Sequence, residues 1–321
     1  SDPMMQRGMA IPMATDIAFS LGVLSVFSKR VPVGLKIFLA ALAVADDLGG
    51  IIVIALFYSS DIDIMYLLLS ALCAAAMILA NILKCHRKRF YVLFGLMLWY
   101  LMLNSGIHAT IAGVITAFCV PSTLTKGTGY YLERIRKNVN KFPVINIDEQ
   151  HNTIVLTNDQ VHTLKSIESA ADKMISPLQD LEDHLHFTIN YVVIPLFAFA
   201  NAGIDLSGMS IGTLFSGAGL AVMLGLVLGK FIGVFSFSWV AVRLNIVKLP
   251  TNTTWKAFAS VCVICGIGFT VSMFIADLSY SGLAEVGDAL LDQAKLGVLV
   301  GSVISAVLGV ILLSRTLPEE N

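Results

Sequence analysis

The sequence predicts an all-α, polytopic membrane protein with about nine spanning helices, two of them broken. Its 321 residues are 56% apolar and only 13% charged, with a mean hydropathy of +0.81. Apolar segments close to the length of a membrane span recur along the chain, and the basic residues gather in alternate connections between them. A soluble globule of this size needs more polar surface than the chain provides, so lipid must cover part of it.

Nine segments are apolar over roughly the 20 residues that cross the hydrocarbon core of a bilayer. They lie at about 9–27, 33–58, 64–84, 89–104, 106–120, 185–203, 217–241, 257–279 and 289–313. The fourth and fifth segments are short and have almost no connection between them, which predicts a tight helical hairpin.

Alternate connections differ in charge. One set, together with the C-terminal tail, holds 17 lysines and arginines, whereas the other set holds none. Because cytoplasmic loops of membrane proteins collect Lys and Arg, the basic set is predicted to be cytoplasmic. This places the N-terminus of the chain outside and the C-terminus in the cytoplasm. The alternation also supports the number of spans, since a missed helix would move the later basic loops to the other side.

A long polar connection divides the chain into three predicted parts. Residues 1–121 form a membrane part with five spans, residues 122–184 form a polar insertion, and residues 185–321 form a second membrane part with four spans. The insertion is too long for an ordinary loop. We interpret it as a cytoplasmic surface segment.

Two elements are predicted within this insertion. Asn152–Leu156 favours an extended piece, and the apolar spacing from about Asp159 to Ile175 favours an amphipathic helix that Pro177 ends.

Two adjacent aspartates lie in the middle of the 33–58 segment. Asp46 and Asp47 each cost about 2.5–3.5 kcal/mol at that depth of a bilayer. Neighbouring side chains point about 100° apart on a helix, so the two carboxylates cannot both face one partner. One can pair with a cation of the protein while the other meets a transported ion. The alternative is a buried ion pair that serves packing alone.

Lys230 is the candidate protein cation. It lies within Gly229–Gly233, about a dozen residues from either end of its apolar segment. Lys36 and Lys295, in contrast, lie near helix ends, where their ammonium groups can reach the membrane interface. A buried lysine keeps its proton more easily when a carboxylate lies beside it. A cation that engages this carboxylate therefore favours loss of the proton from the lysine, so cation binding and protonation can compete.

Two segments carry features that interrupt a helix. Pro12 removes a backbone donor from the first segment, and Thr15 can bond the freed carbonyl groups. Gly266 and Gly268 weaken the 257–279 segment. Paired broken helices in a transporter point to an ion site at the membrane midplane, where Asp16 could neutralise the ends of half-helix dipoles.

A cluster of acidic residues and histidines lies at the predicted cytoplasmic mouth of the 185–203 segment. Its members are Glu182, Asp183, His184 and His186. Histidine titrates near neutrality, so a pH-sensing role is open for Glu182 and His186. A solvated helix start is equally compatible with the cluster.

Five motifs lie on the predicted helices, at Ala14–Phe19, Leu42–Gly49, His108–Gly113, Pro195–Gly203 and Cys265–Thr270. In this order they resemble the NhaA family of bacterial sodium/proton antiporters. The resemblance covers nearly all of the chain outside residues 122–180.

The resemblance implies a role for each residue of the predicted site. Asp47 would bind Na+ or Li+ and exchange it for protons, and Asp46 would pair with Lys230. Thr15 and Asp16 would occupy the crossing of two unwound helices.

The resemblance also assigns two features outside the Asp pair. Gly268 would lie at the second helix break. Glu182 and His186 match positions that the family associates with pH activation, although the glutamate is followed here by Asp183, which departs from the family pattern.

As a member of this family, the chain would be an electrogenic transporter of the bacterial inner membrane rather than an enzyme. It would use the proton gradient to expel sodium. The transported ions would be Na+, Li+ and H+, and no cofactor is expected. The expected partners are the lipid bilayer and a second copy of the chain, with no nucleic acid.

The family pattern has twelve spanning helices, and this sequence starts at the position of the fourth. We therefore expect an inverted-repeat antiporter fold that lacks its first three helices, including the hairpin associated with dimer formation. The alternative is a transport-inactive fragment of such an antiporter.

A rival hypothesis from another class is an intramembrane aspartyl protease, which also needs two aspartates in the bilayer. That chemistry requires them on separate helices, facing each other across a peptide. Asp46 and Asp47 are adjacent in the sequence, which argues against it.

Overall fold

The computed structural model describes residues 7–27, 30–57, 62–124, 126–141, 158–201, 203, 217–280 and 284–317. In these ranges all regular secondary structure is helical, which confirms the predicted all-α class for this part of the chain. Contacts divide the described residues into two compact units, one from residues 1–59 and 190–321 and the other from residues 60–189. We call them the first and the second unit.

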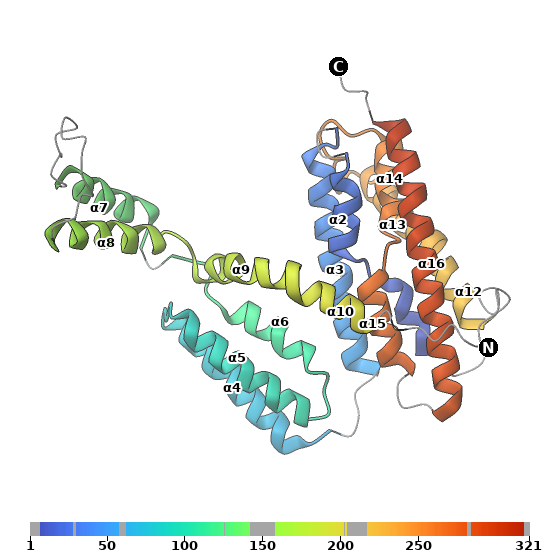
Figure 1. Cartoon of the computed structure of the whole chain (residues 1–321), viewed down its shortest axis with the longest axis horizontal. Coiled ribbons are helices and arrows are strands. Elements are labelled where there is room, and N and C mark those ends of the chain that lie inside the picture. Colours follow the sequence, from blue (N-terminus) through green and yellow to red (C-terminus); the bar gives the residue numbers. More distant parts are fainter. Residues whose placement is uncertain are drawn as a thin grey trace, which may run out of the picture. The chain divides into compact units, whose positions relative to one another are not determined.

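The first unit contains both predicted broken helices and the helices around them (Figure 1). Its elements are the 3-10 helix η1 (Arg7–Met13), α2 (Ile17–Ser25), α3 (Val33–Phe57), α10 (Ile194–Asn201), α12 (Gly217–Leu224), the π-helix η3 (Gly225–Gly229), α13 (Lys230–Arg243), α14 (Trp255–Ile264), α15 (Phe269–Tyr280) and α16 (Ala284–Thr316).

Four helical stretches in the described residues are long and apolar enough to cross a membrane. They are Arg7–Ser25, Ile64–Ile82, Gly217–Arg243 and Gly287–Thr316, and α14 with α15 adds a fifth span bent by 44°. These five agree with five of the predicted segments. The other four segments also contain helix in the described residues, in α3, α5, α6 and α10. The count of nine spans remains a prediction.

Helix α16, the long red helix of Figure 1, packs against α12, α14 and α15. Small residues allow this close approach, as is common between membrane helices. At Gly297, a Cβ atom would lie 3.0 Å from the Cα atom of Gly219 on α12. Any larger side chain at residue 297 would push the two helices apart.

Two clusters of buried apolar side chains lie on opposite sides of the helix breaks. One contains Ile11 of η1 and Met273 of α15, and the other contains Leu24 of α2 and Ile264 of α14. The first half of one broken helix therefore packs with the second half of the other. This antiparallel crossing brings the two breaks together.

The second unit consists of α4 (Ile64–Ile82), α5 (Lys88–Asn104), α6 (Thr110–Cys119), α7 (Thr128–Lys141), α8 (Asn158–Asp172) and α9 (Pro177–Thr188), followed by the π-helix η2 (Ile189–Val193) at its boundary with the first unit. Helices α5 and α6 pack on each other and form the predicted hairpin. Gly106, with φ of 80°, lies in the turn between them; this left-handed conformation suits glycine.

The polar insertion contains α7, α8 and the beginning of α9. Helix α8 agrees with the predicted amphipathic helix but ends at Asp172, and α7 was not predicted. Helix α8 ends before Pro177, and Pro177 itself occupies the first turn of the next helix, α9, where its missing N–H costs no hydrogen bond. Asn152–Leu156 lies outside the described residues. The division at residues 121 and 184 remains a prediction.

Candidate functional site

The first break lies between η1 and α2. Pro12 is within the 3-10 helix, which ends at Met13. Ala14–Asp16 has no helical structure, and Asp16 is extended, with φ of −75° and ψ of 105°. A proline N–H is absent and the backbone leaves the helical path, so carbonyl groups near Met13 become available to side chains from other helices.

The second break lies between α14 and α15, at Cys265–Gly268. A Cβ atom at Gly266 would lie 2.5 Å from the carbonyl oxygen of Leu226 and 2.6 Å from Oγ of Ser305. A Cβ at Gly268 would also collide with Ser272. Both glycines allow neighbouring elements to approach the unwound backbone closely.

Asp16 joins the two breaks. Its backbone N–H donates to the carbonyl of Ile267, 2.7 Å away. Its Oδ1 accepts from the N–H of Phe19 at 3.1 Å, and its Oδ2 accepts from both the N–H and the hydroxyl of Thr270. This carboxylate is 2% exposed and caps the N-termini of α2 and α15, whose positive dipole ends favour a negative charge.

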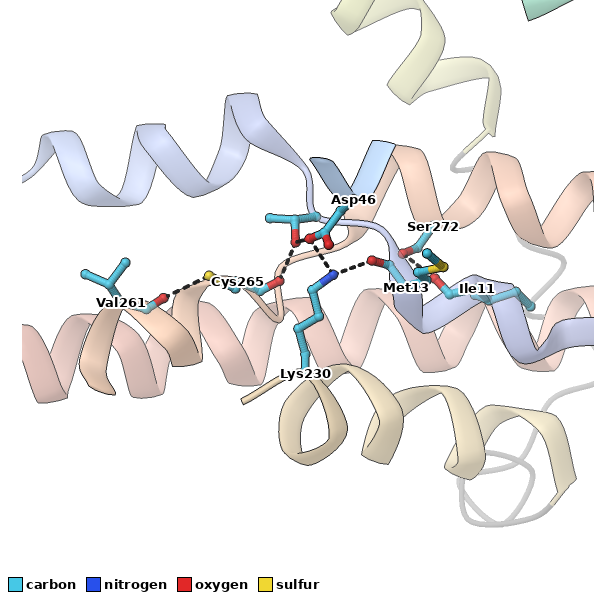
Figure 2. Close-up of polar contacts among 8 residues, drawn as sticks. Ile11, Met13, Asp46, Lys230, Val261, Cys265 and Ser272 are labelled. Carbon is cyan, nitrogen blue, oxygen red and sulfur yellow. Dashed lines mark hydrogen bonds and ion pairs between the residues drawn. The ribbon is translucent and has the colours of Figure 1, made fainter. Parts of the chain in front are cut away.

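Lys230 contacts the C-terminal end of η1, which carries the negative end of the helix dipole. It begins α13 directly after the π-helix η3 and is 8% exposed. As Figure 2 shows, its ammonium group donates to the carbonyl of Met13 and forms an ion pair with Oδ2 of Asp46, at 2.7 Å. The ion pair that the resemblance implies is thus present in the structure.

Thr15 connects this ion pair to the second break. Its buried Oγ1 lies 2.8 Å from Oδ2 of Asp46 and 3.0 Å from the carbonyl oxygen of Cys265. A hydroxyl has one proton, so Thr15 donates to one of these two oxygens at a time. The carboxylate of Asp46 and the carbonyl group of Cys265 therefore share the single hydroxyl proton of Thr15.

Asp47 differs from its neighbour Asp46. Its Oδ1 is buried and has no hydrogen-bond partner among the described residues. A buried acceptor without a partner is costly, and it is the kind of atom that a bound cation satisfies. The adjacent acids therefore have the two different surroundings that their positions on α3 predict.

Glu182 and His186 are the two residues predicted to sense pH. Both lie on α9 in the second unit, and their side chains are exposed. On the same helix, Asp180 forms an ion pair with Lys88 at 2.6 Å, and its Oδ1 lies 3.1 Å from Nδ1 of His184. The pH-sensing role of Glu182 and His186 remains a prediction.

One ion pair with a buried lysine was missed in the sequence. Lys295 of α16 lies 3.0 Å from Oδ1 of Asp277 on α15. The interpretation that Lys295 reaches the membrane interface is wrong, because its side chain is only 9% exposed and is held by Asp277. An acidic residue within the apolar 257–279 segment is the signal that could have identified this pair.

Comparisons with known proteins agree with the motifs on which this site is built. Residues 1–313 match the family model described as Na+/H+ antiporter 1. The chain is similar to proteins named Na(+)/H(+) antiporter NhaA. The one from Bacteroides fragilis is 51% identical over 313 residues, 98% of this chain and 70% of the relative.

More distant relatives carry the same name. The protein from Phocaeicola vulgatus is 49% identical over 98% of this chain and 69% of its own length. The protein from Shewanella loihica is 42% identical over 100% of this chain and 69% of its own length. The chain therefore belongs to the Na+/H+ antiporter 1 family, a family of membrane transporters rather than enzymes.

Proposed function

We propose that this chain exchanges Na+ for protons across a membrane, with Asp47 and Asp46 as the groups for which the ions compete. The observation that carries the proposal is the contrast between the two acids. Asp46 is neutralised by Lys230, while a buried oxygen of Asp47 has no partner among the described residues. Relatives over the whole chain are named Na+/H+ antiporters.

The site offers the oxygen ligands that hard cations prefer. The carboxylates of Asp46 and Asp47, the hydroxyl of Thr15 and the carbonyl of Cys265 are the candidates for Na+ or Li+. The cation would satisfy the free oxygen of Asp47 and attract Asp46 away from Lys230. Protonation of Asp47 satisfies the same oxygen, so the two ions exclude each other.

Electrogenic exchange follows from the same contacts. When a cation engages Asp46, Lys230 loses its counter-ion in a buried place, where an unpaired ammonium is costly. Release of a proton from Lys230, in addition to one from Asp47, lets one cation exchange for more than one proton. The exchange of one Na+ for two protons changes the net charge of the site by one, which makes it electrogenic, and every step uses only the transported ions and these side chains.

We further propose that the crossing of the two broken helices is exposed to one side of the membrane at a time. The basic connections place the C-terminus in the cytoplasm and the N-terminus of this chain outside, in the bacterial inner membrane. Proton entry and sodium exit would then use the same carboxylates in turn. A homodimer and regulation by pH through Glu182 and His186 belong to the same proposal.

An intramembrane aspartyl protease does not fit the site. Asp46 and Asp47 follow each other on α3, whereas that chemistry needs carboxylates facing each other from separate helices. Asp16, on the neighbouring broken helix, uses both carboxylate oxygens to accept from Phe19 and Thr270.

The test is Na+-dependent proton movement in vesicles that contain the purified chain and carry an imposed pH gradient. We expect Asp47→Asn to abolish this movement, while Asp172→Asn, a matched change at an exposed position of α8, leaves it unchanged. Transport that survives Asp47→Asn would refute the role of Asp47. Binding of radioactive sodium without any transport would identify the transport-inactive alternative.

A further inference from the structure

A second ion pair is held inside the first unit, away from Asp46 and Lys230. The ammonium of Lys295 lies 3.0 Å from Oδ1 of Asp277, with the two side chains 9% and 34% exposed. Lys295 lies within the span Gly287–Thr316, and Asp277 lies on the second half of the bent span. The exchange mechanism described above does not use this pair. The ammonium of Lys295 is buried, and a buried charge is costly unless it is paired, so its position calls for a reason.

This ion pair and a hydrogen bond at the other end of the contact both join α15 to α16. At the start of α15, the N–H of Phe269 donates to Oγ of Ser302 on α16, 3.1 Å away. Asp277 follows Phe269 by eight residues, and Lys295 precedes Ser302 by seven. With a rise of about 1.5 Å per residue, these separations agree to within roughly 2 Å along the two antiparallel helices. The two contacts therefore fix one register of α15 on α16.

The contacts between these two points are apolar. Buried residues of the two helices, among them Met273, Ala276, Ala294 and Val298, share one cluster. Apolar burial is not directional, so it favours contact between the helices without selecting one register strongly. An ion pair, in contrast, favours the register in which its two charged groups meet.

The register of α15 matters because Thr270 follows Phe269 directly. Thr270 donates to Asp16 through both its N–H and its hydroxyl. A small slide or rotation of α15 on α16 would move both donors away from Asp16. The cap that joins the two breaks would then be lost.

We propose that Asp277 and Lys295 are positioning residues, which hold α15 in register on α16 so that Thr270 stays on Asp16 during ion exchange. This inference rests on the proposed Na+/H+ exchange. It assigns a task to two residues that do not touch the ion.

The decisive variant replaces the pair by apolar residues, Asp277→Leu with Lys295→Met. Apolar replacements of a buried pair usually leave the fold as stable or more stable. If the pair only stabilises the fold, this variant keeps both its melting temperature and its transport. If the pair sets the register, the melting temperature in detergent is kept, but Na+-dependent proton movement falls about tenfold or more, because a misplacement near 1 Å is enough for such a loss.

Two further readouts follow the register itself. Amide hydrogen exchange of a peptide covering Phe269–Val271 should accelerate in the apolar variant, because the N–H of Thr270 loses Asp16. Reversal of the charges, Asp277→Lys with Lys295→Asp, should restore slow amide exchange and transport. The single change Asp277→Asn should be the least stable variant, since it leaves Lys295 buried and unpaired.

Wild-type transport and wild-type amide exchange in the apolar variant would overturn the proposal. So would a folded charge-reversed variant that restores neither property. If the apolar variant fails to fold, the test rests on whether the charge-reversed variant restores slow amide exchange and transport. If the wild-type chain itself moves no protons, the proposed function has failed, and the amide exchange alone decides whether the pair positions Thr270.

Discussion

The ammonium of Lys230 lies 2.7 Å from the carboxylate of Asp46 and also donates to the carbonyl of Met13, at the end of the first half-helix. One cation thus neutralises an acid of α3 and satisfies the backbone of a helix break. This double use connects the charge of the Asp pair to the geometry of the crossing.

Lys230→Met should destabilise the chain strongly. It leaves the largely covered carboxylate of Asp46 without its cation and removes the donor from Met13, and breaking an ion pair inside a protein costs up to about 3–5 kcal/mol. Thermal unfolding in detergent measures the effect as a lower melting temperature. Lys230→Arg keeps the charge and should recover part of the loss. An unchanged melting temperature for Lys230→Met would contradict the importance of this contact.

Asp16→Ala should loosen both broken helices at once. Asp16 caps α2 and α15, and loss of one helix cap typically costs about 1 kcal/mol, so two caps cost about 2 kcal/mol. Asp16→Asn keeps one acceptor oxygen and should lie between the wild type and Asp16→Ala. Amide exchange at Phe19 and Thr270 reports the two caps separately. Faster exchange at only one of them would show that Asp16 serves a single helix.

Gly266→Ala should be far more disruptive than Gly233→Ala. A Cβ at Gly266 would lie 2.5 Å from the carbonyl oxygen of Leu226, whereas no atom lies within 4 Å of a Cβ at Gly233. Overpacking of this kind costs about 1–3 kcal/mol. The comparison of melting temperatures in detergent tests it. Equal effects of the two alanines would mean that the second break does not approach η3 and α16 as closely as described.

Thr15→Val should weaken apparent Na+ affinity about tenfold, the value of roughly one hydrogen bond to a charged group. Valine matches the shape of threonine but has no hydroxyl for Asp46, Cys265 or the cation. Thr15→Ser keeps the hydroxyl and is the control. The concentration of Na+ that gives half-maximal proton movement in vesicles is the measurement. If valine and serine behave alike, the hydroxyl plays no part in exchange.

Much of the site could be predicted because charge is rare inside apolar helices. Position within an apolar segment was enough to single out four charged residues, because each lies away from the segment's ends: Asp16, Asp46, Asp47 and Lys230. The interruption at Pro12 also follows from local chemistry, as proline removes a donor whatever surrounds it. Such signals need no knowledge of the tertiary structure.

The partners of these residues could not be predicted from local sequence. Asp16 meets Thr270 across 254 residues of chain, and Thr15 meets the carbonyl of Cys265 across 250. Main-chain acceptors carry no sequence signal at all. The buried position of Lys295 was missed for the same reason, because distance from a helix end does not reveal that another helix supplies an aspartate.

Acidification should raise the apparent KM for Na+, because protons and Na+ compete for the free oxygen of Asp47. A proton on that oxygen must leave before a cation can bind, so at low pH the apparent KM should increase by about tenfold per pH unit for the proton of Asp47, and more steeply where Lys230 releases its proton as well. Raising the pH should lower it to a constant value. The maximum rate at saturating Na+ should change less.

Measurements of Na+-dependent proton movement at several pH values test this, with Glu182→Gln as a control for regulation from α9. That change should alter the pH at which transport begins and leave the competition itself intact. A KM for Na+ that does not depend on pH would exclude a shared carboxylate and require separate sites for the two ions.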